Sequence, residues 1–233
     1  MAIDNVKLNA FLPCRLGSER VPNKNIKRFS SFEFGLIEIK IEQLLSTKSI
    51  DNVILSTNDE RIIKYAESLG EKKLKIFVRD DKLSSGTTTT DSLIEYASDI
   101  MPEGHILWTH VTSPFLSKDV YEDAIGTYYD SLNKGYDSLM TVSRIQGFLW
   151  NGDGAINYDR SVEKWPRTQT IPPVFEVNSG IFLAHKDVYI ENKDRIGLAP
   201  YMFELDRIKG FDIDWEDDFM LAEYIHASGM GKC

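Results

Sequence analysis

The chain has 233 residues, of which 42% are hydrophobic and 27% charged, and its net charge is −9. This composition suits one α/β domain with a substantial core, and the acidic balance excludes a general nucleic-acid binder, because phosphate backbones require a basic face. No stretch reaches the ~18 apolar residues of a membrane span, the first residues show no signal-peptide pattern, and the two cysteines form neither a metal-binding nor a disulfide pattern. We expect a cytoplasmic protein without membrane or nucleic-acid partners.

Strands and helices are predicted to alternate up to about residue 142. Short apolar runs predict strands at residues 8–13, 53–56, 74–78, 106–108 and 138–142. Apolar residues at helical spacing predict helices at residues 36–45, from 58 or 59 to 69, around 93–97 and at about 117–132. This alternation predicts a mostly parallel sheet with helices on both faces.

The alternation breaks between residues 147 and 178, where Asn, Gly, Pro and Trp are frequent. We expect an irregular insertion with small strands there, inside a single domain that spans residues 1–233. Further strands are predicted at 178–184 and 211–214, and an amphipathic helix at 217–227. The acidic residues 216–218 are assigned to favourable charge at that helix's N-terminus.

Three loops should meet at the carboxyl edge of the sheet, where ligands bind in such folds: residues 14–25, 79–90 and 110–114. The first is conspicuously basic, since five cations between residues 14 and 28 face a single acid, Glu19. Backbone N–H groups and cations after a strand can bind a phosphate. The loop is not a P-loop, because no GxxxxGK[ST] is present, and charge alone fits a solvated basic loop equally well.

Asp212 and Asp214 form the second candidate site. Carboxylates two residues apart on an extended segment point to the same side, and such a pair can hold Mg²⁺ together with substrate phosphates. Other polar segments are weak indicators on their own. These are residues 109–114 with His110, Arg79 with residues 84–90, residues 167–169, and residues 178–180.

Taken in order, these segments resemble the acylneuraminate cytidylyltransferases, the CMP-sialic acid synthetase family. The family pattern PARGGSKRIPRKN appears as PCRLGSERVPNKN at 13–25, STDD as STND at 56–59, and QPTSP as HVTSP at 110–114. The family's RPxxLASDxASS resembles residues 79–90, its RxQxxPxxYxxNG resembles the stretch from 167 to 178, and its IDIDxxxDF resembles 211–219. The resemblance runs from about residue 8 to residue 225.

The resemblance implies a Rossmann-like three-layer nucleotide-diphospho-sugar transferase fold, with the insertion at about 147–178 serving dimerisation. It implies a homodimer that couples CMP from CTP to the anomeric hydroxyl of an acidic 2-keto-3-deoxy sugar and releases pyrophosphate, with Mg²⁺ as cofactor. Nucleotide-binding residues would be Arg15, Ser18, Lys24, Asn25, Arg79 and Thr90. Catalytic residues would be Arg15, Lys24, Asp212 and Asp214, with Mg²⁺ on the two aspartates. Sugar-binding residues would be His110, Gln169 and Phe182.

The chain departs from the family pattern at four positions. His110 replaces Gln, Val111 replaces Pro, Glu19 replaces Lys, and Phe182 replaces Tyr. These changes leave the sugar open among sialic acid, a related nonulosonate and a shorter ulosonate. Other hypotheses are an enzyme that uses another NTP or a sugar 1-phosphate, a glycosyltransferase, since these also use Asp-x-Asp, and a catalytically degenerate nucleotide-binding protein. Location alone makes His110 a candidate base.

Overall fold

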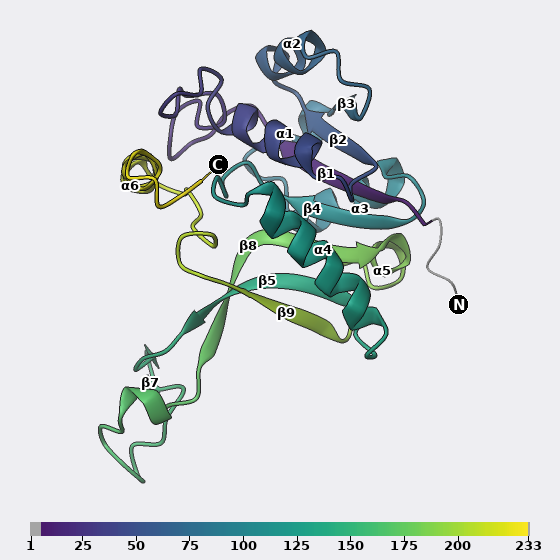
Figure 1. Ribbon diagram of the computed structural model, residues 1–233. Coiled ribbons are helices and arrows are strands. Elements are labelled where there is room, and N and C mark those ends of the chain that lie inside the picture. The colour runs from purple at the N-terminus through teal and green to yellow at the C-terminus, as the bar shows by residue number, and fades with distance from the viewer. Residues whose placement is uncertain (1–5, 233) are drawn as a thin grey trace.

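A computed structural model describes residues 6–232 and shows one seven-stranded sheet with helices on both faces (Figure 1). The strand order across the sheet is β3-β2-β1-β4-β8-β5-β9. Their bounds are β1 Leu8–Cys14, β2 Asn52–Thr57, β3 Leu74–Val78, β4 His105–Thr109, β5 Ser138–Ile145, β8 Val174–His185 and β9 Pro200–Leu205. The predicted α/β class is therefore confirmed.

The sheet is mostly parallel, as predicted. β1 pairs in parallel with β2 and β4, β2 with β3, and β5 with β9. β8 alone runs against its neighbours, β4 and β5. The carboxyl ends of β1, β3 and β4 consequently lie at the same edge of the sheet, which brings the loops that follow them together.

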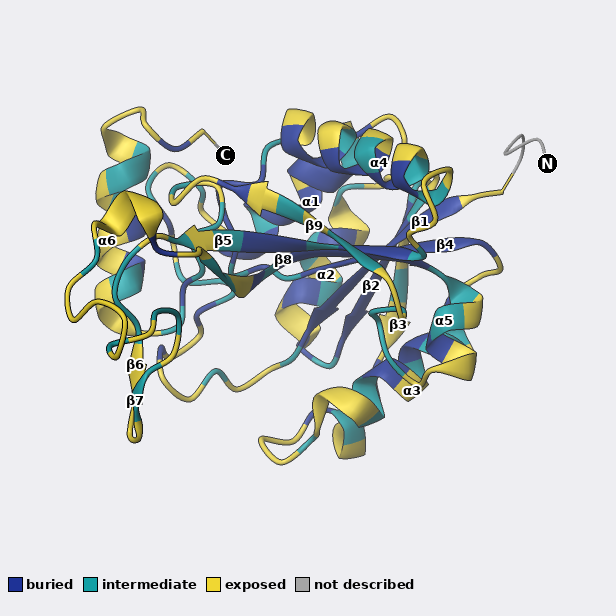
Figure 2. Ribbon diagram, turned by 90° about the horizontal axis from the view of Figure 1, so that it is seen from below, coloured by how far each residue is buried: buried dark blue, intermediate teal, exposed yellow. Residues whose placement is uncertain are grey.

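Two apolar layers sandwich the sheet. One contains α1 (Leu36–Ser46) and α4 (Lys118–Leu132), and the other contains α3 (Thr90–Ile100) and α5 (Lys186–Glu191). Every residue of β1 is buried, because helices cover both of its faces. Alternation along the strand sends Leu12 into the first layer and Phe11 into the second. In Figure 2 the strands are largely dark blue and the outward sides of the helices yellow.

Two helices frame the edge that carries the site. α2 (Glu60–Ser68) starts behind Asp59, whose side chain accepts a hydrogen bond from the Arg61 backbone, as an N-cap does. α6 (Glu216–Ala227) begins with three acidic residues and packs Phe219 edge-on against Phe29. Both match the sequence-based expectation closely.

Residues 146–173, which we call the arm, leave the sheet between β5 and β8 and project away from it (Figure 1). The arm contains the two-stranded hairpin β6 (Trp150–Asn151) and β7 (Gly154–Ala155) and a 3₁₀ turn at Thr168–Thr170. An irregular insertion with small strands was predicted here. β8 itself begins at Val174, four residues before the predicted start.

Several sequence-based expectations need correction. The predicted strand at 211–214 is absent, because the segment contacts its neighbour through Ile213 N–H donating to Thr112 O (2.9 Å) rather than through a ladder. β9, α5 and a 3₁₀ turn at Asp81–Leu83 were not predicted. These elements are short, and β9 is a partly exposed edge strand. No helix within residues 6–232 combines the length and the apolar character that crossing a bilayer requires.

Candidate active site

The three predicted loops surround one cavity of about 420 Å³, which we call the first cavity. The basic loop after β1 supplies most of its wall, and Arg79 and the segment after β4 complete it. The residues from these loops that line it include Arg15, Ser18, Glu19, Arg20, Lys24, Asn25, Arg79, His110 and Thr112. Four cations thus converge on one hollow in an acidic protein, an arrangement that favours an anionic ligand.

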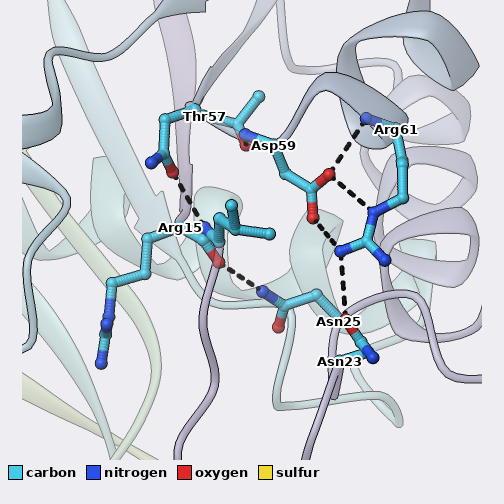
Figure 3. Close-up of polar contacts among 8 residues, drawn as sticks. Arg15, Asn23, Asn25, Thr57, Asp59 and Arg61 are labelled. Carbon is cyan, nitrogen blue, oxygen red and sulfur yellow. Dashed lines mark hydrogen bonds and ion pairs between the residues drawn. The ribbon is translucent and has the colours of Figure 1, made fainter.

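Backbone-directed amides hold the basic loop in place (Figure 3). Asn58 Oδ1 accepts from Leu16 N–H (2.9 Å), and Asn25 Nδ2 donates to Arg15 O (3.1 Å). Figure 3 shows the Arg15 side chain extending away from this network, and its guanidinium lies 3.8 Å from Glu19 Oε1. The loop backbone is therefore fixed while the Arg15 head remains available to a ligand.

The ion pair between Arg61 and Asp59 stabilises the basic loop near Asn23. Arg61 reaches both Asp59 oxygens (Nε–Oδ1 3.0 Å, Nη2–Oδ2 2.8 Å) and also donates to Asn23 Oδ1 (3.1 Å), as Figure 3 shows. Asn23 sits at φ +54°, a left-handed conformation that Asn tolerates better than most residues. The contact with Arg61 secures this turn against α2.

Arg79 is an unusual group in the first cavity. It is only 4% exposed, yet its Nε and Nη2 have no hydrogen-bond partner. Burial lowers the pKa of its guanidinium. The neighbouring Cys14 cannot neutralise it, because burial raises the pKa of that thiol to about 12. Burying a cation without a partner costs free energy, so the unpaired N–H groups of Arg79 are suited to donate to an acceptor atom of a ligand.

Two further cavities continue from the first. A middle cavity of about 240 Å³ shares Leu93, His110 and Thr112 with the first, and also involves Thr90, Trp108 and Arg195. An outer cavity of about 650 Å³ shares Ser179 and Asp212 with the middle one. The three form one trough that runs from the basic loop to the base of the arm.

Lys24 links the basic loop to the segment that carries the two aspartates. Its ammonium donates to Ile213 O and lies 3.9 Å from Asp214 Oδ1. Burial lowers the pKa of Lys24, while the facing Asp214 and Asp212 carboxylates oppose that shift. Arg20 makes a closer ion pair with Asp214, at 2.7 Å. Asp214 therefore lies among cations of the first cavity, although its segment is not a strand.

Asp212 and Asp214 both line the outer cavity, and they fit a divalent cation. Oδ1 of Asp212 is buried without a hydrogen-bond partner. Burial raises the pKa of this carboxyl, the Thr112 hydroxyl opposes that shift, and the Asp214 carboxylate adds to it. A cation near both aspartates would relieve the buried negative charge. A separate group, Glu103, His185 and Asp187, lies by the amino end of β4, away from the trough.

His110 is held as a neutral hydrogen-bond acceptor. Its Nε2 accepts from Trp108 Nε1 (3.0 Å) and faces Arg195 Nη1 at 3.3 Å. Burial, with smaller contributions from Arg195, Lys40 and Lys24, lowers the pKa of the imidazole to about 3. A nitrogen that already faces two donors is a poor proton acceptor, so this geometry argues against His110 as the general base.

Most residues singled out from the sequence lie in the trough, and two do not. Arg15, Ser18, Lys24, Asn25, Arg79, Thr90, His110, Asp212 and Asp214 line one or more of the cavities. Gln169 is exposed on the arm and lines none of these three cavities. Phe182 is 1% exposed in the core, because its strand position points it into the α3–α5 layer. Direct sugar contact by Phe182 is thus a wrong expectation.

Sequence reasoning missed Arg195 and Arg207 and gave residues 178–180, with Ser179, only as a weak indicator, although all three residues line the middle or outer cavity. Ser179 has φ +58° beside the irregular register between β5 and β8, and the polar segment 178–180 does not reveal this conformation. Arg195 and Arg207 lie in segments without a predicted element.

A family model described as cytidylyltransferase matches residues 10–225. The pseudaminic acid cytidylyltransferase of Campylobacter jejuni is 34% identical over 128 residues, or 53% of each chain. The N-acylneuraminate cytidylyltransferase of Streptococcus agalactiae is 26% identical over 222 residues, covering 90% of this chain and 51% of the relative. The matches thus span about half the length of these curated relatives.

Among solved structures, the fold is similar to that of CMP:2-keto-3-deoxy-manno-octonic acid synthetase complexed with CTP. The TM-score is 0.68 at 17% identity, and the match covers 96% of this chain and 99% of the other. This likeness, at such low identity, concerns the fold.

Proposed function

We propose that this chain, which belongs to the cytidylyltransferase family, transfers CMP from CTP to the anomeric hydroxyl of an acidic 2-keto-3-deoxy sugar and releases pyrophosphate. One observation carries the proposal. A cluster of cations, which includes the buried and unpartnered Arg79, lies at one end of a single trough. An Asp212 oxygen without a hydrogen-bond partner lies where the middle cavity meets the outer cavity. Such a trough suits a nucleotide, a metal and a second substrate in line.

The first cavity would bind CTP. Arg79 lies at its buried wall and would donate to acceptor atoms of the nucleoside, since its Nε and Nη2 have no other partner. Arg15, Lys24 and the loop around Ser18 would neutralise the phosphates. Binding the triphosphate would draw Arg15 away from Glu19, a contact of 3.8 Å between exposed groups that costs little to break.

Asp212 and Asp214 would hold Mg²⁺, which would offset charge on the phosphates and on the leaving pyrophosphate. Lys24 lies beside both aspartates and also lines the first cavity, so it would act on the same phosphates. Catalysis would come mainly from positioning and charge neutralisation at the α-phosphate, where the sugar hydroxyl attacks in line.

The acidic sugar would occupy the middle and outer cavities. The relatives support this class of acceptor, because their names specify pseudaminic acid and N-acylneuraminate. His110 would contribute a neutral wall at the border between the nucleotide and the sugar rather than a base.

A homodimer in the cytoplasm is part of this proposal. The arm exposes large apolar side chains, with Trp150, Ile156, Val162 and Trp165 between 52% and 83% exposed. A second copy of the chain would cover them. Gln169 lies on the same arm, so its predicted contact with sugar would be made in the partner's trough.

The test is pyrophosphate release with CTP, Mg²⁺ and a panel of pseudaminic acid, N-acetylneuraminic acid and 2-keto-3-deoxy-manno-octonic acid, with ATP, GTP and UTP as nucleotide controls. We expect release with CTP and one of these acids. Asp212→Asn should lower kcat on the order of 10²-fold or more, because one oxygen ligand of the metal is lost.

Glu103→Gln is the matched control, since Glu103 belongs to the acidic group at the amino end of β4 and is expected to leave kcat unchanged. Release that is equal for all four nucleotides would contradict the assignment of CTP. No release with any of the acids, while CTP still binds, would refute the proposed reaction.

A further inference from the structure

Arg195 is the one permanently charged cation among the described residues that line the middle cavity. It comes from the segment between α5 and β9, which the family-like motifs of the sequence do not include. Its guanidinium carbon lies 3.7 Å from the centroid of the Phe182 ring and 5.1 Å from that of Trp108. These aromatic rings fix the position of the cation.

The guanidinium of Arg195 is not paired with a carboxylate of the described residues. Within residues 6–232 no salt bridge joins its guanidinium to an acid. The neighbouring Asp194 carboxylate accepts from the Arg195 backbone N–H instead (2.6 Å). The side chain's polar contact is His110 Nε2 at 3.3 Å, and that imidazole is neutral. A planar donor fork therefore faces the middle cavity with no carboxylate of the described residues paired to it, although Asp212 lines the same cavity.

The structure of the acidic sugar determines where its carboxylate must lie. In a 2-keto-3-deoxy sugar acid in ring form, the anomeric carbon bears both the attacking hydroxyl and the carboxylate. The carboxylate must then sit next to the reacting phosphate and the two aspartates. The middle cavity is that place, because it contains Asp212 and shares Thr112 and His110 with the first cavity.

We propose that Arg195 binds the carboxylate of the acidic sugar and so selects 2-ulosonic acids over neutral sugars. This inference rests on the proposed function. Phe182 and Trp108 act beneath Arg195 as its support, and His110 holds one of its N–H groups, which leaves the other donors of the fork for the two carboxylate oxygens. The cations of the first cavity remain assigned to the nucleotide.

The test compares the acid that reacts fastest in the panel with its carboxamide. Arg195→Met should raise KM for the acid about 10- to 100-fold, because a charge-assisted bidentate contact is lost, and leave KM for CTP within about 2-fold. Wild type should prefer the acid to the carboxamide, and the variant should lose most of that preference. Arg195→Lys should restore part of it, since Lys keeps the charge without the fork.

Lys193→Met is the matched control, because Lys193 is an exposed cation two residues away in the same segment. It should leave both KM values unchanged. An Arg195→Met enzyme with an unchanged KM for the acid, or with KM for CTP raised in parallel, would overturn the inference while the proposed reaction stands. A wild type that is inactive with every acid would overturn both.

Discussion

Arg79 allows a prediction in which stability and ligand binding change in opposite directions. Arg79→Met should increase the free energy of unfolding of the ligand-free protein, since Arg79 is 4% exposed and two of its nitrogens have no partner. Removing a buried cation that lacks its partner should stabilise the fold by about 1–3 kcal/mol, and Met retains much of the packed stem. For a chain of this length, that corresponds to a rise in Tm of roughly 2–10 °C.

The same substitution should weaken CTP binding. Charge-assisted hydrogen bonds contribute about 1.5–3 kcal/mol, so the Kd for CTP should rise about 10- to 100-fold. Urea unfolding followed by circular dichroism measures the first quantity, and calorimetric titration with CTP measures the second. Arg28→Met is the control, because Arg28 is an exposed arginine paired with Glu33 at 3.3 Å, and both quantities should change little.

The result that would refute this reasoning is specific. If Arg79→Met lowers ligand-free stability by the amount usual for a core substitution, then the guanidinium has compensating interactions in the folded protein. If CTP affinity is unchanged, the first cavity does not use Arg79 for the nucleotide, whatever happens to stability.

Two further predictions concern pH and self-association. The pKa of His110 is about 3 in the folded protein against an ordinary 6.5, so its contribution to stability is complete above pH 6.5 and is lost as pH falls toward 3. The free energy of unfolding, measured by urea denaturation, should fall by about 2 kcal/mol between pH 7 and pH 5 because of this histidine. His110→Gln should remove this part of the pH dependence of the free energy of unfolding. If the variant and the wild type show the same pH dependence, the imidazole is accessible to protons in the folded protein. Trp165→Glu on the arm should weaken self-association about 10-fold or more in sedimentation experiments, whereas the equally apolar but remote Leu198→Glu should not. A wild type that is monomeric at every concentration would contradict the dimer.

The elements that the sequence predicted well are those whose burial is set locally. β1 is covered on both faces and shows as a largely apolar run, and the basic loop after it is conspicuous in an acidic chain. Asp212 and Asp214 line one cavity, although the strand that was predicted to carry them is absent. They share it because Lys24 and Thr112 hold the segment between them, and not because a strand alternates there.

The residues that the sequence did not reveal depend on tertiary packing. The resemblance implied that the aromatic residue Phe182 contacts the sugar. The alternation of side chains along the antiparallel strand β8 buries its ring instead. The cation that rests on that ring, Arg195, returns from an unpredicted segment after α5. A pairing between such distant residues leaves no spacing pattern for sequence reasoning to detect.

β8 connects the arm to the outer end of the trough, which we assign to the sugar. Asn178 Oδ1 accepts from Thr141 Oγ1 (2.6 Å) and Gly180 N–H (3.2 Å), while its Nδ2 donates to Ser143 (3.0 Å). These bonds hold Ser179 at φ +58°, a conformation that serine seldom adopts, inside β8 at the shift in its register with β5. Because Ser179 lines both the middle and the outer cavity, a partner subunit that packed on the arm, as we propose, would act through β8 on the end of the trough assigned to the sugar. The basic loop is anchored through Asn58 and α2, and Lys24 also ties it to the segment that carries Asp212 and Asp214, so the end of the trough at the basic loop would feel the same force only through that segment.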